Sequence, residues 1–190
     1  MKYITPLLET DRLVLKRGIL GDYYKVYEYD FRKLRNINNE FEMVKQNLEN
    51  LKGFDTYADE EDEVFDWIVY LKENGAPIAN ITADRENKNI KSTEIAFNMH
   101  PDYWKNGYMS EAIIRVLEFL FEFGFENVMC GYSEGNINSK RIGDKLGFVP
   151  LLEIPNAWEK DGISITDYKT IMSKEKFKEL YRTKNGKGHY

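Results

Sequence analysis

The stretch HPDYWKNGYMSEA, residues 100–112, combines a turn with the start of a helix. Asn106 and Gly107 form a dipeptide that is typical of turns, and Ser110 followed by Glu111 is typical of a helix start. The first N–H groups of a helix have no partner within the helix, and the helix dipole adds positive potential there. The stretch therefore offers a simple site for a phosphate group, although an ordinary capped turn fits the same thirteen residues.

Hydrophobic periodicity predicts the elements around this stretch. The predicted strands are residues 13–17, 64–71, 78–85, 92–99, 127–133, 148–154 and 163–172. The predicted helices are residues 23–28 behind an Asp22 cap, the amphipathic segment 40–52, the buried segment 111–123, and residues 137–146 and 174–180. The short turns 73–77 and 86–89 should join three strands into an antiparallel meander, whereas 55–63 and 155–162 are predicted loops. The expected fold class is α+β, with a central mixed, mostly antiparallel sheet flanked by helices.

Composition places the chain among ordinary globular proteins, with 42% apolar and 31% charged residues. We expect one domain over residues 1–182 and a disordered polar tail over 183–190. The net charge of −5 argues against a nucleic-acid partner. One cysteine and two histidines leave few ligands for a metal site, so no metal is expected. No apolar run has the length of a membrane span and the N-terminus has no signal-peptide core, so a cytoplasmic location is expected.

Two longer stretches carry a resemblance to a known family. EIAFNMHPDYWKNGYMSEA (94–112), followed by EGNINSKRIGDKLGF (134–148), resembles the GNAT superfamily of acyl-CoA N-acyltransferases. The opening LETDRLVLK (8–16) and the variant of the turn that carries Trp104 resemble its branch of ribosomal-protein N-terminal acetyltransferases. The resemblance covers residues 7 to about 172. It implies a GNAT-type fold, acetyl-CoA as cosubstrate, and direct attack of a primary amine on the thioester.

The resemblance also implies where acetyl-CoA binds. The backbone of Asn98, Met99 and His100 would pair with the pantetheine arm as an added strand does. Asn136 would hydrogen-bond a pantetheine amide. The pyrophosphate would bind the N–H groups of Lys105, Asn106, Gly107, Tyr108, Met109 and Ser110. A partly packed loop histidine is the better interpretation of the His100 side chain, and Asn136 also fits an ordinary helix cap.

Glu94 is the predicted general base. On strand 92–99 it shares a face with Ala96 and Asn98, and several members of the superfamily keep their base on a strand beside the cofactor. An exposed strand carboxylate without a catalytic role is an equally good interpretation. Asp167 and Tyr168 are the second candidates.

Ser139 is the predicted acid, because the tyrosine that commonly protonates the thiolate in this superfamily is replaced by Gly143. Helix capping is the alternative role for Ser139. Cys130 is interpreted as a small buried hydrophobic residue and not as a nucleophile. The chain also has Lys105 where glycine is usual and Met109, next to the phosphates, where a small residue is usual. These departures keep open a non-catalytic acyl-CoA-binding or regulatory module on the same fold.

The partners expected are acetyl-CoA and an amine acceptor, with neither nucleic acid nor membrane. The acceptor would be a protein N-terminal amine or a small amine such as a polyamine or an antibiotic. Exposed strand edges of this fold often pair, which would give a homodimer.

Overall fold

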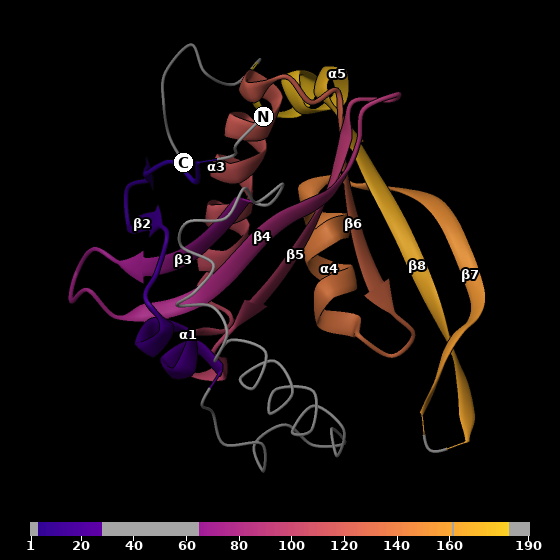
Figure 1. Cartoon of the computed structure of the whole chain (residues 1–190), viewed down its shortest axis with the longest axis horizontal. Coiled ribbons are helices and arrows are strands. Elements are labelled where there is room, and N and C mark those ends of the chain that lie inside the picture. Colours follow the sequence, from indigo (N-terminus) through magenta and orange to yellow (C-terminus); the bar gives the residue numbers. More distant parts are fainter. Residues whose placement is uncertain (1–3, 28–64, 161, 183–190) are drawn as a thin grey trace. The chain divides into compact units, whose positions relative to one another are not determined.

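The computed structural model describes residues 4–27, 65–160 and 162–182 of the chain (Figure 1). The predicted helix at 40–52, the predicted acidic loop at 55–63 and the predicted tail at 183–190 lie outside the described residues.

The described elements form one mixed sheet with helices. The strands are β1 (Leu8–Glu9), β2 (Leu13–Lys16), β3 (Phe65–Leu71), β4 (Pro77–Asn87), β5 (Ser92–Met99), β6 (Asn127–Ser133), β7 (Val149–Lys160) and β8 (Ile163–Ser173). The helices are α1 (Leu20–Tyr27), the 3₁₀ turn η3 (Pro101–Tyr103), α3 (Tyr108–Phe123), α4 (Ile137–Leu146), α5 (Lys174–Phe177) and the π-helical turn η4 (Lys178–Arg182).

The strand order in the sheet is β1-β2-β3-β4-β5-β6-β8-β7. β5 and β6 run parallel, whereas β1 with β2, β2 with β3, β6 with β8 and β7 with β8 run antiparallel. A mostly antiparallel mixed sheet with helices confirms the predicted fold class. The three strands of the predicted meander, β3, β4 and β5, are neighbours in this order.

The described residues group into two compact units. The first unit extends to Thr82 and includes residues 97–112, so it contains β1, β2, β3, α1, η3 and the first turn of α3. The second unit comprises residues 83–96 and the chain from Ile113 onward, with the rest of α3, β6, α4, β7, β8 and α5. β4 and β5 pass from one unit into the other. The expectation of a single domain over residues 1–182 stays a prediction.

Each unit has its own buried apolar side chains, as the sequence pattern requires. Those of the first unit include Leu13, Leu15, Tyr23, Val26, Trp67 and Ile68. Those of the second unit include Val116, Leu117, Leu120, Val128, Met172 and Phe177. In the second unit α4 lies beside β6, and β7 and β8 form a long hairpin (Figure 1).

The predicted start of the first helix is wrong by three residues. α1 begins at Leu20 and not after Asp22. The Oδ2 atom of Asp22 accepts a hydrogen bond from the backbone N–H of Ile19 at 3.2 Å. An acidic side chain in the first turn can cap the helix by reaching back in this way, and sequence alone does not distinguish it from a residue that precedes the helix.

The predicted loop at 155–162 is also wrong, because β7 continues through most of it. The pairing with β8 is irregular between Ile154 and Trp158, and Asn156 adopts a positive φ of 54°. β7 is the last strand of the sheet order, and an edge strand with a bulge tolerates a proline such as Pro155. The loop-like composition therefore marks an irregular edge strand.

No helix in the described part of the chain is long and apolar enough to cross a membrane.

Candidate active site

The predicted phosphate-binding turn has two residues in the left-handed region on either side of Asn106. Lys105 has φ 65° and Gly107 has φ 81°. Glycine adopts this conformation freely, whereas a residue with a β-carbon such as lysine adopts it at a cost of about 1–2 kcal/mol. All three residues of the turn are exposed. The turn is therefore accessible to a ligand and strained at Lys105.

α3 begins directly after this turn, three residues earlier than predicted. The backbone N–H of Glu111 donates to the carbonyl of Gly107 at 3.1 Å, which is the first bond of the helical ladder. Ser110 and Glu111 consequently lie inside the first turn of α3, and the N–H groups of Tyr108 and the two residues after it are those that a helix leaves without an internal partner. These are among the donors that the family resemblance assigns to the pyrophosphate.

Met109 stands where a small residue is usual in the family, but its side chain does not add bulk at the turn. Its side chain is only 4% exposed and belongs to the buried residues of the first unit. The thioether of Met109 therefore packs in the core, and only its backbone is available to a ligand at the start of α3.

Side-chain hydrogen bonds of Trp104 and Asn106 connect the turn to the residues that precede it. The Nδ2 atom of Asn106 donates to the carbonyls of Tyr103 at 3.2 Å and Trp104 at 3.1 Å. The indole N–H of Trp104 donates to the carbonyl of Met99 at 2.8 Å. These bonds tie the turn to the end of β5.

His100 connects β5 with η3. Its Nδ1 atom accepts a hydrogen bond from the backbone N–H of Asp102 at 3.2 Å, so the imidazole caps η3. Its backbone N–H donates to the carbonyl of Ile78 at 2.9 Å, and its carbonyl accepts from Tyr103 at 3.0 Å. A cofactor contact to the backbone of His100 would have to use the second lone pair of that carbonyl. This contact, and those of Asn98 and Met99, stay predictions.

Glu94, in the second unit, forms an ion pair with Lys169 on β8. The carboxylate side chain is 12% exposed, so Glu94 is not an exposed strand carboxylate, while its role as a base or as a purely structural ion-pair partner stays a prediction. A β-carbon on Gly131 would lie 3.1 Å from Nζ of Lys169 and 3.4 Å from Oε1 of Glu94. Glycine on β6 therefore makes room for this ion pair on the sheet surface.

The alternative bases Asp167 and Tyr168 lie further along β8. Oδ1 of Asp167 accepts hydrogen bonds from the hydroxyl of Ser133 at 2.6 Å and from the indole N–H of Trp158 at 3.1 Å. The ring of Tyr168 stacks on Tyr132, with 5.2 Å between centroids. Asp167 thus connects three strands of the second unit.

The pKa of Tyr168 lies above its ordinary value, first because of desolvation and then because of the nearby Glu153 and Glu134 carboxylates. A phenol acts as a base only when ionised, and a raised pKa lowers its ionised fraction at neutral pH. Tyr168 is therefore a weaker candidate base than a carboxylate.

Asn136 and Ser139 open α4, as predicted. Oδ1 of Asn136 accepts a hydrogen bond from the backbone N–H of Ser139 at 3.1 Å and caps the helix. Gly147, with φ 88°, closes it. The capping role of Asn136 is confirmed, while its contact with the cofactor and the role of the Ser139 hydroxyl as an acid stay predictions.

The Cys130 side chain is buried, and this burial raises the pKa of its thiol to about 12, with a further contribution from the Glu94 carboxylate. A buried thiol with a raised pKa is a poor nucleophile, which agrees with the interpretation from the sequence.

The predicted residues are divided between the two units. Asn98, Met99, His100 and the segment 105–110 lie in the first unit, whereas Glu94, Asn136 and Ser139 lie in the second. Within the described ranges, no group of three or more His, Cys, Asp or Glu side chains could hold a metal ion.

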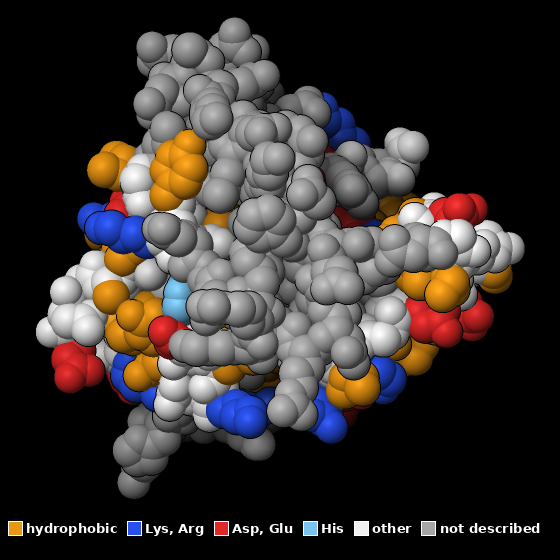
Figure 2. Space-filling view, turned by 90° about the horizontal axis from the view of Figure 1, so that it is seen from below, with side chains coloured by type: hydrophobic (Ala, Val, Ile, Leu, Met, Phe, Trp, Pro, Cys, Tyr) orange, Lys and Arg blue, Asp and Glu red, His pale blue; other side chains and the backbone are white. Residues whose placement is uncertain are grey.

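On the face shown in Figure 2, basic and acidic side chains of the described residues are interspersed.

Comparison with known proteins connects this geometry to a family. Residues 6–149 match the family model of an acetyltransferase (GNAT) domain. The uncharacterized N-acetyltransferase YoaA of Bacillus subtilis is 24% identical over 148 residues, which cover 75% of this chain and 82% of that protein.

Solved structures of low sequence identity share the fold. A ribosomal-protein-S5-alanine acetyltransferase from Vibrio fischeri superposes with a TM-score of 0.65 at 16% identity, covering 90% of this chain and 98% of that one. A chimera of the spermidine N-acetyltransferase SpeG from Vibrio cholerae and hSSAT superposes with a TM-score of 0.70 at 14% identity, covering 87% of this chain and 97% of the other.

Proposed function

The chain belongs to the acetyltransferase (GNAT) family, and we propose that it is an N-acetyltransferase that moves an acetyl group from acetyl-CoA to a primary amine. The amine nitrogen attacks the thioester carbonyl carbon and forms a C–N bond. The C–S bond then breaks, the acetylated amine loses one proton, and the CoA thiolate gains one. The family's cosubstrate supplies the acetyl group, and the chain supplies binding and proton transfer.

The observation that carries this proposal is the exposed turn at residues 105–107, directly before the sixteen-residue helix α3. Backbone N–H groups at a helix start bind the pyrophosphate of acetyl-CoA in this proposal. Met109 supports it, because its side chain is buried and leaves the start of the helix accessible. Lys105, which is exposed, adds a positive charge beside the phosphates. Asn136 binds an amide of the pantetheine arm.

We assign proton transfer to residues of the second unit. Glu94 accepts the proton of the attacking amine, directly or through a water molecule. Lys169 neutralises the charge of this largely buried carboxylate between turnovers. Ser139 donates a proton to the leaving thiolate, in place of the tyrosine that Gly143 replaces.

The acceptor is proposed only as a class. Structural neighbours of the chain have names that specify a ribosomal-protein alanine in one case and spermidine in another. The net charge of −5 mildly favours a cationic amine of either kind. We further propose a cytoplasmic enzyme that pairs with a second copy along β7, the last strand of the sheet, where Leu151, Leu152 and Trp158 are exposed.

A screen of amines with acetyl-CoA and colorimetric detection of released thiol tests the activity. The panel should contain peptides with free serine or alanine N-termini, polyamines such as spermidine, and aminoglycosides. Acceptor-dependent thiol release supports the enzyme and identifies the acceptor class. Binding of acetyl-CoA without turnover on any amine would favour the non-catalytic module.

The Gly107→Val variant tests the phosphate-binding turn. A β-branched side chain disfavours a φ of 81°, so acetyl-CoA affinity should fall at least tenfold, or about 1.4 kcal/mol. Gly75→Val is the matched control, because Gly75 has φ 71° in the turn between β3 and β4, and a β-carbon added there would meet no atom within 4 Å. Titration calorimetry that gives wild-type affinity for Gly107→Val would refute this role of the turn.

A further inference from the structure

We propose that Arg12, in the turn between β1 and β2, is the positioning residue of the phosphate-binding turn. The inference rests on the proposed function of that turn and adds a residue far away in sequence that sets its geometry. All the residues involved belong to the first unit.

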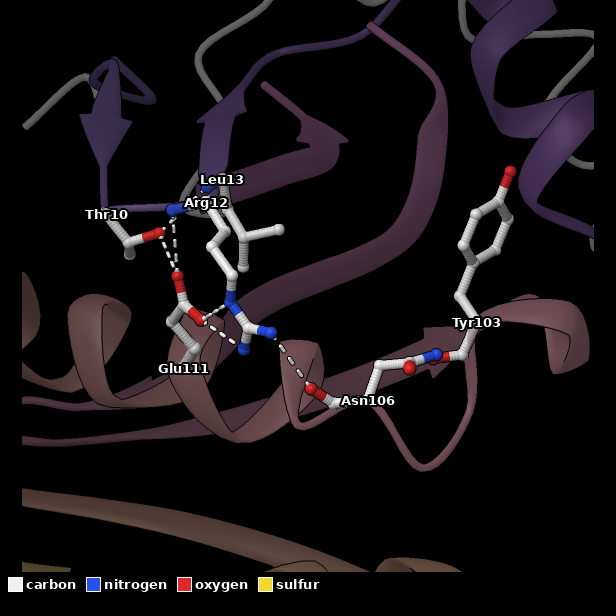
Figure 3. A network of polar contacts seen from close by, with 6 residues as sticks. All are labelled: Thr10, Arg12, Leu13, Tyr103, Asn106 and Glu111. Atoms are coloured by element: carbon white, nitrogen blue, oxygen red, sulfur yellow. Dashed lines mark hydrogen bonds and ion pairs between the residues drawn. The ribbon is translucent and has the colours of Figure 1, made fainter. Parts of the chain in front are cut away.

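The guanidinium of Arg12 contacts the turn and the helix start at once (Figure 3). Nη1 donates to the backbone carbonyl of Asn106 at 3.1 Å. Nε donates to Oε2 of Glu111 at 2.7 Å, and Nη2 lies 2.6 Å from the same oxygen. The guanidinium also lies over the ring of Tyr108, 4.5 Å from its centroid. A planar fork of donors suits this multiple contact, whereas a lysine would provide one point charge.

Glu111, in the first turn of α3, accepts further hydrogen bonds from the turn between β1 and β2. Its Oε1 atom accepts hydrogen bonds from the hydroxyl of Thr10 at 2.5 Å and from the backbone N–H of Arg12 at 3.2 Å. The Thr10 hydroxyl in turn accepts from the backbone N–H of Leu13 at 3.0 Å. The carboxylate side chain is only 11% exposed, although Arg12 is 48% exposed. The β1–β2 turn and the start of α3 are therefore held together through one carboxylate.

The bond to the Asn106 carbonyl fixes the direction of a neighbouring N–H group. The peptide between Asn106 and Gly107 is trans, so its C=O and N–H point in opposite directions. With the carbonyl held toward Arg12, the N–H of Gly107 points away from the guanidinium. Successive N–H groups in a turn with left-handed residues form a concave anion site only when these peptides keep their orientation.

The hydrogen bond from Arg12 to the Asn106 carbonyl matters because the neighbouring residue Lys105 is strained. A residue with a β-carbon at φ 65° is strained and would relax by leaving the left-handed region, and rotation of an adjoining peptide is the simplest route. Arg12 opposes such a rotation, because it would remove the Asn106 carbonyl from Nη1. In this proposal Arg12 acts through the turn, since each of its three guanidinium nitrogens already contacts Glu111 or Asn106.

Hydrogen exchange of the ligand-free protein tests the inference without any cofactor. The Arg12→Met variant keeps most of the side-chain length and removes the donors, so the amides of Leu13 and Glu111, which donate to the Thr10 hydroxyl and the Gly107 carbonyl, should exchange at least tenfold faster. Arg12→Lys keeps the charge without the fork and should behave similarly. Lys72→Met is the matched control: it removes a surface ion pair of the same unit, Lys72 with Glu9 at 2.8 Å, and should leave these amides unchanged. Wild-type exchange of the Leu13 and Glu111 amides in both Arg12 variants would overturn the inference.

Acetyl-CoA titrations of the same proteins separate positioning from direct contact. Positioning predicts that Arg12→Met and Glu111→Gln each weaken binding at least fivefold, and that the double variant is no weaker than the worse single one. If Arg12 instead contacted phosphate directly, Glu111→Gln would release the guanidinium and leave affinity equal or higher, which would overturn the inference. If the wild-type protein fails to bind acetyl-CoA, the proposed function is refuted, and the exchange data alone decide whether Arg12 orders the turn.

Discussion

Glu111 in the first unit and Glu94 in the second are both largely buried carboxylates with a basic partner, yet they are held differently. Glu111 receives the side chain of Arg12, the backbone N–H of the same residue and the Thr10 hydroxyl. Glu94 is paired with the ammonium of Lys169, a compact charge at the end of a flexible stem. The two sites therefore differ in how freely the carboxylate can change partners.

This difference indicates different roles. A carboxylate fixed by a planar fork and a backbone donor cannot take up a substrate proton without losing several bonds, which suits a structural tie. A carboxylate held by a lysine can bind a substrate amine while the lysine moves a short way. The Lys169 side chain lies directly over Gly131 on β6, where a β-carbon would come within 3.1 Å of its Nζ atom. We therefore expect Glu111 to control affinity for the cofactor and Glu94 to control the rate.

The Glu94→Gln variant should produce the largest effect. A small effect would contradict the assignment of the rate to Glu94 and of cofactor affinity to Glu111. The variant keeps the shape and removes the base, and base catalysis of this kind contributes roughly 10²- to 10⁴-fold. We expect kcat to fall at least tenfold, with acetyl-CoA affinity nearly intact, and to recover as pH rises and free amine becomes available. Steady-state kinetics across pH provide the measurement. Glu126→Gln is the control, since Glu126 pairs with Lys174 at 3.7 Å in the same unit. An unchanged rate and pH profile for Glu94→Gln would transfer the base to Asp167 or to solvent.

A third carboxylate extends the comparison to alkaline pH. Oδ2 of Asp66 accepts from the buried Tyr23 hydroxyl, and Oδ1 accepts from the Asn80 amide at 2.7 Å. Burial first, and then Asp66, raises the pKa of Tyr23 well above its ordinary value. The pKa of Tyr70, which donates to Asp22, is raised for similar reasons.

The raised pKa of Tyr23 makes the free energy of unfolding depend on pH in the alkaline range. Above about pH 10 an unfolded tyrosine loses its proton while Tyr23 in the folded protein keeps it, so stability is retained below pH 10 and falls as pH rises beyond it. Tyr23 alone should contribute a slope of about 1.4 kcal/mol per pH unit. Denaturant unfolding between pH 9 and pH 11.5, in wild type and Tyr23→Phe, measures it. Equal slopes in the two proteins would contradict the assignment.

Ser139→Ala addresses the other proton of the reaction in the second unit. An acid that acts only in the transition state should change kcat by about tenfold with little change in acetyl-CoA affinity. The α4 cap should persist, because the bond to Asn136 uses the backbone N–H of Ser139. Turnover equal to wild type would leave Ser139 as a residue of the first turn of α4 without a catalytic role, and thermal unfolding would verify that the fold is unaffected.

Lys105→Gly should produce the smallest effect. It tests separately the backbone strain and the side-chain charge of Lys105 in the first unit. Glycine relieves the left-handed strain, by about 1 kcal/mol, and partly offsets this by making the unfolded chain more flexible. We expect a small rise in melting temperature together with a few-fold loss of acetyl-CoA affinity that high salt abolishes, because a charge is lost. A salt-independent loss would show that the lysine side chain does not act through its charge.

Much of the fold was predictable because local signals agreed with tertiary structure. α4 has the predicted bounds, since Asn136 caps it and Gly147 ends it with residues that suit those positions. β7 was not predictable, because its continuation past Pro155 depends on pairing with β8 and on a bulge. Edge position, which local composition does not encode, decides whether a proline interrupts a strand.

The site was predictable in its segments and not in its connections. Asn106 and Gly107 indicate the turn and the helix start, whereas Arg12 stands out in the sequence only as part of a family-like opening. Its contacts with Glu111 join residues ninety-nine positions apart, and no local pattern predicts such a pair. Lys169 was not predictable for the same reason, because only strand register brings it to Glu94.

The buried thiol of Cys130 has a practical consequence for experiments on this protein. It is the chain's only cysteine, and with a pKa of about 12 it would be ionised in fewer than about one molecule in a thousand at pH 8. Aromatic disulfide reagents should therefore report released CoA with little background from the enzyme. A single cysteine introduced at an exposed position away from β7, for example Lys88→Cys, would accept a maleimide dye at one position and allow fluorescence anisotropy to follow self-association.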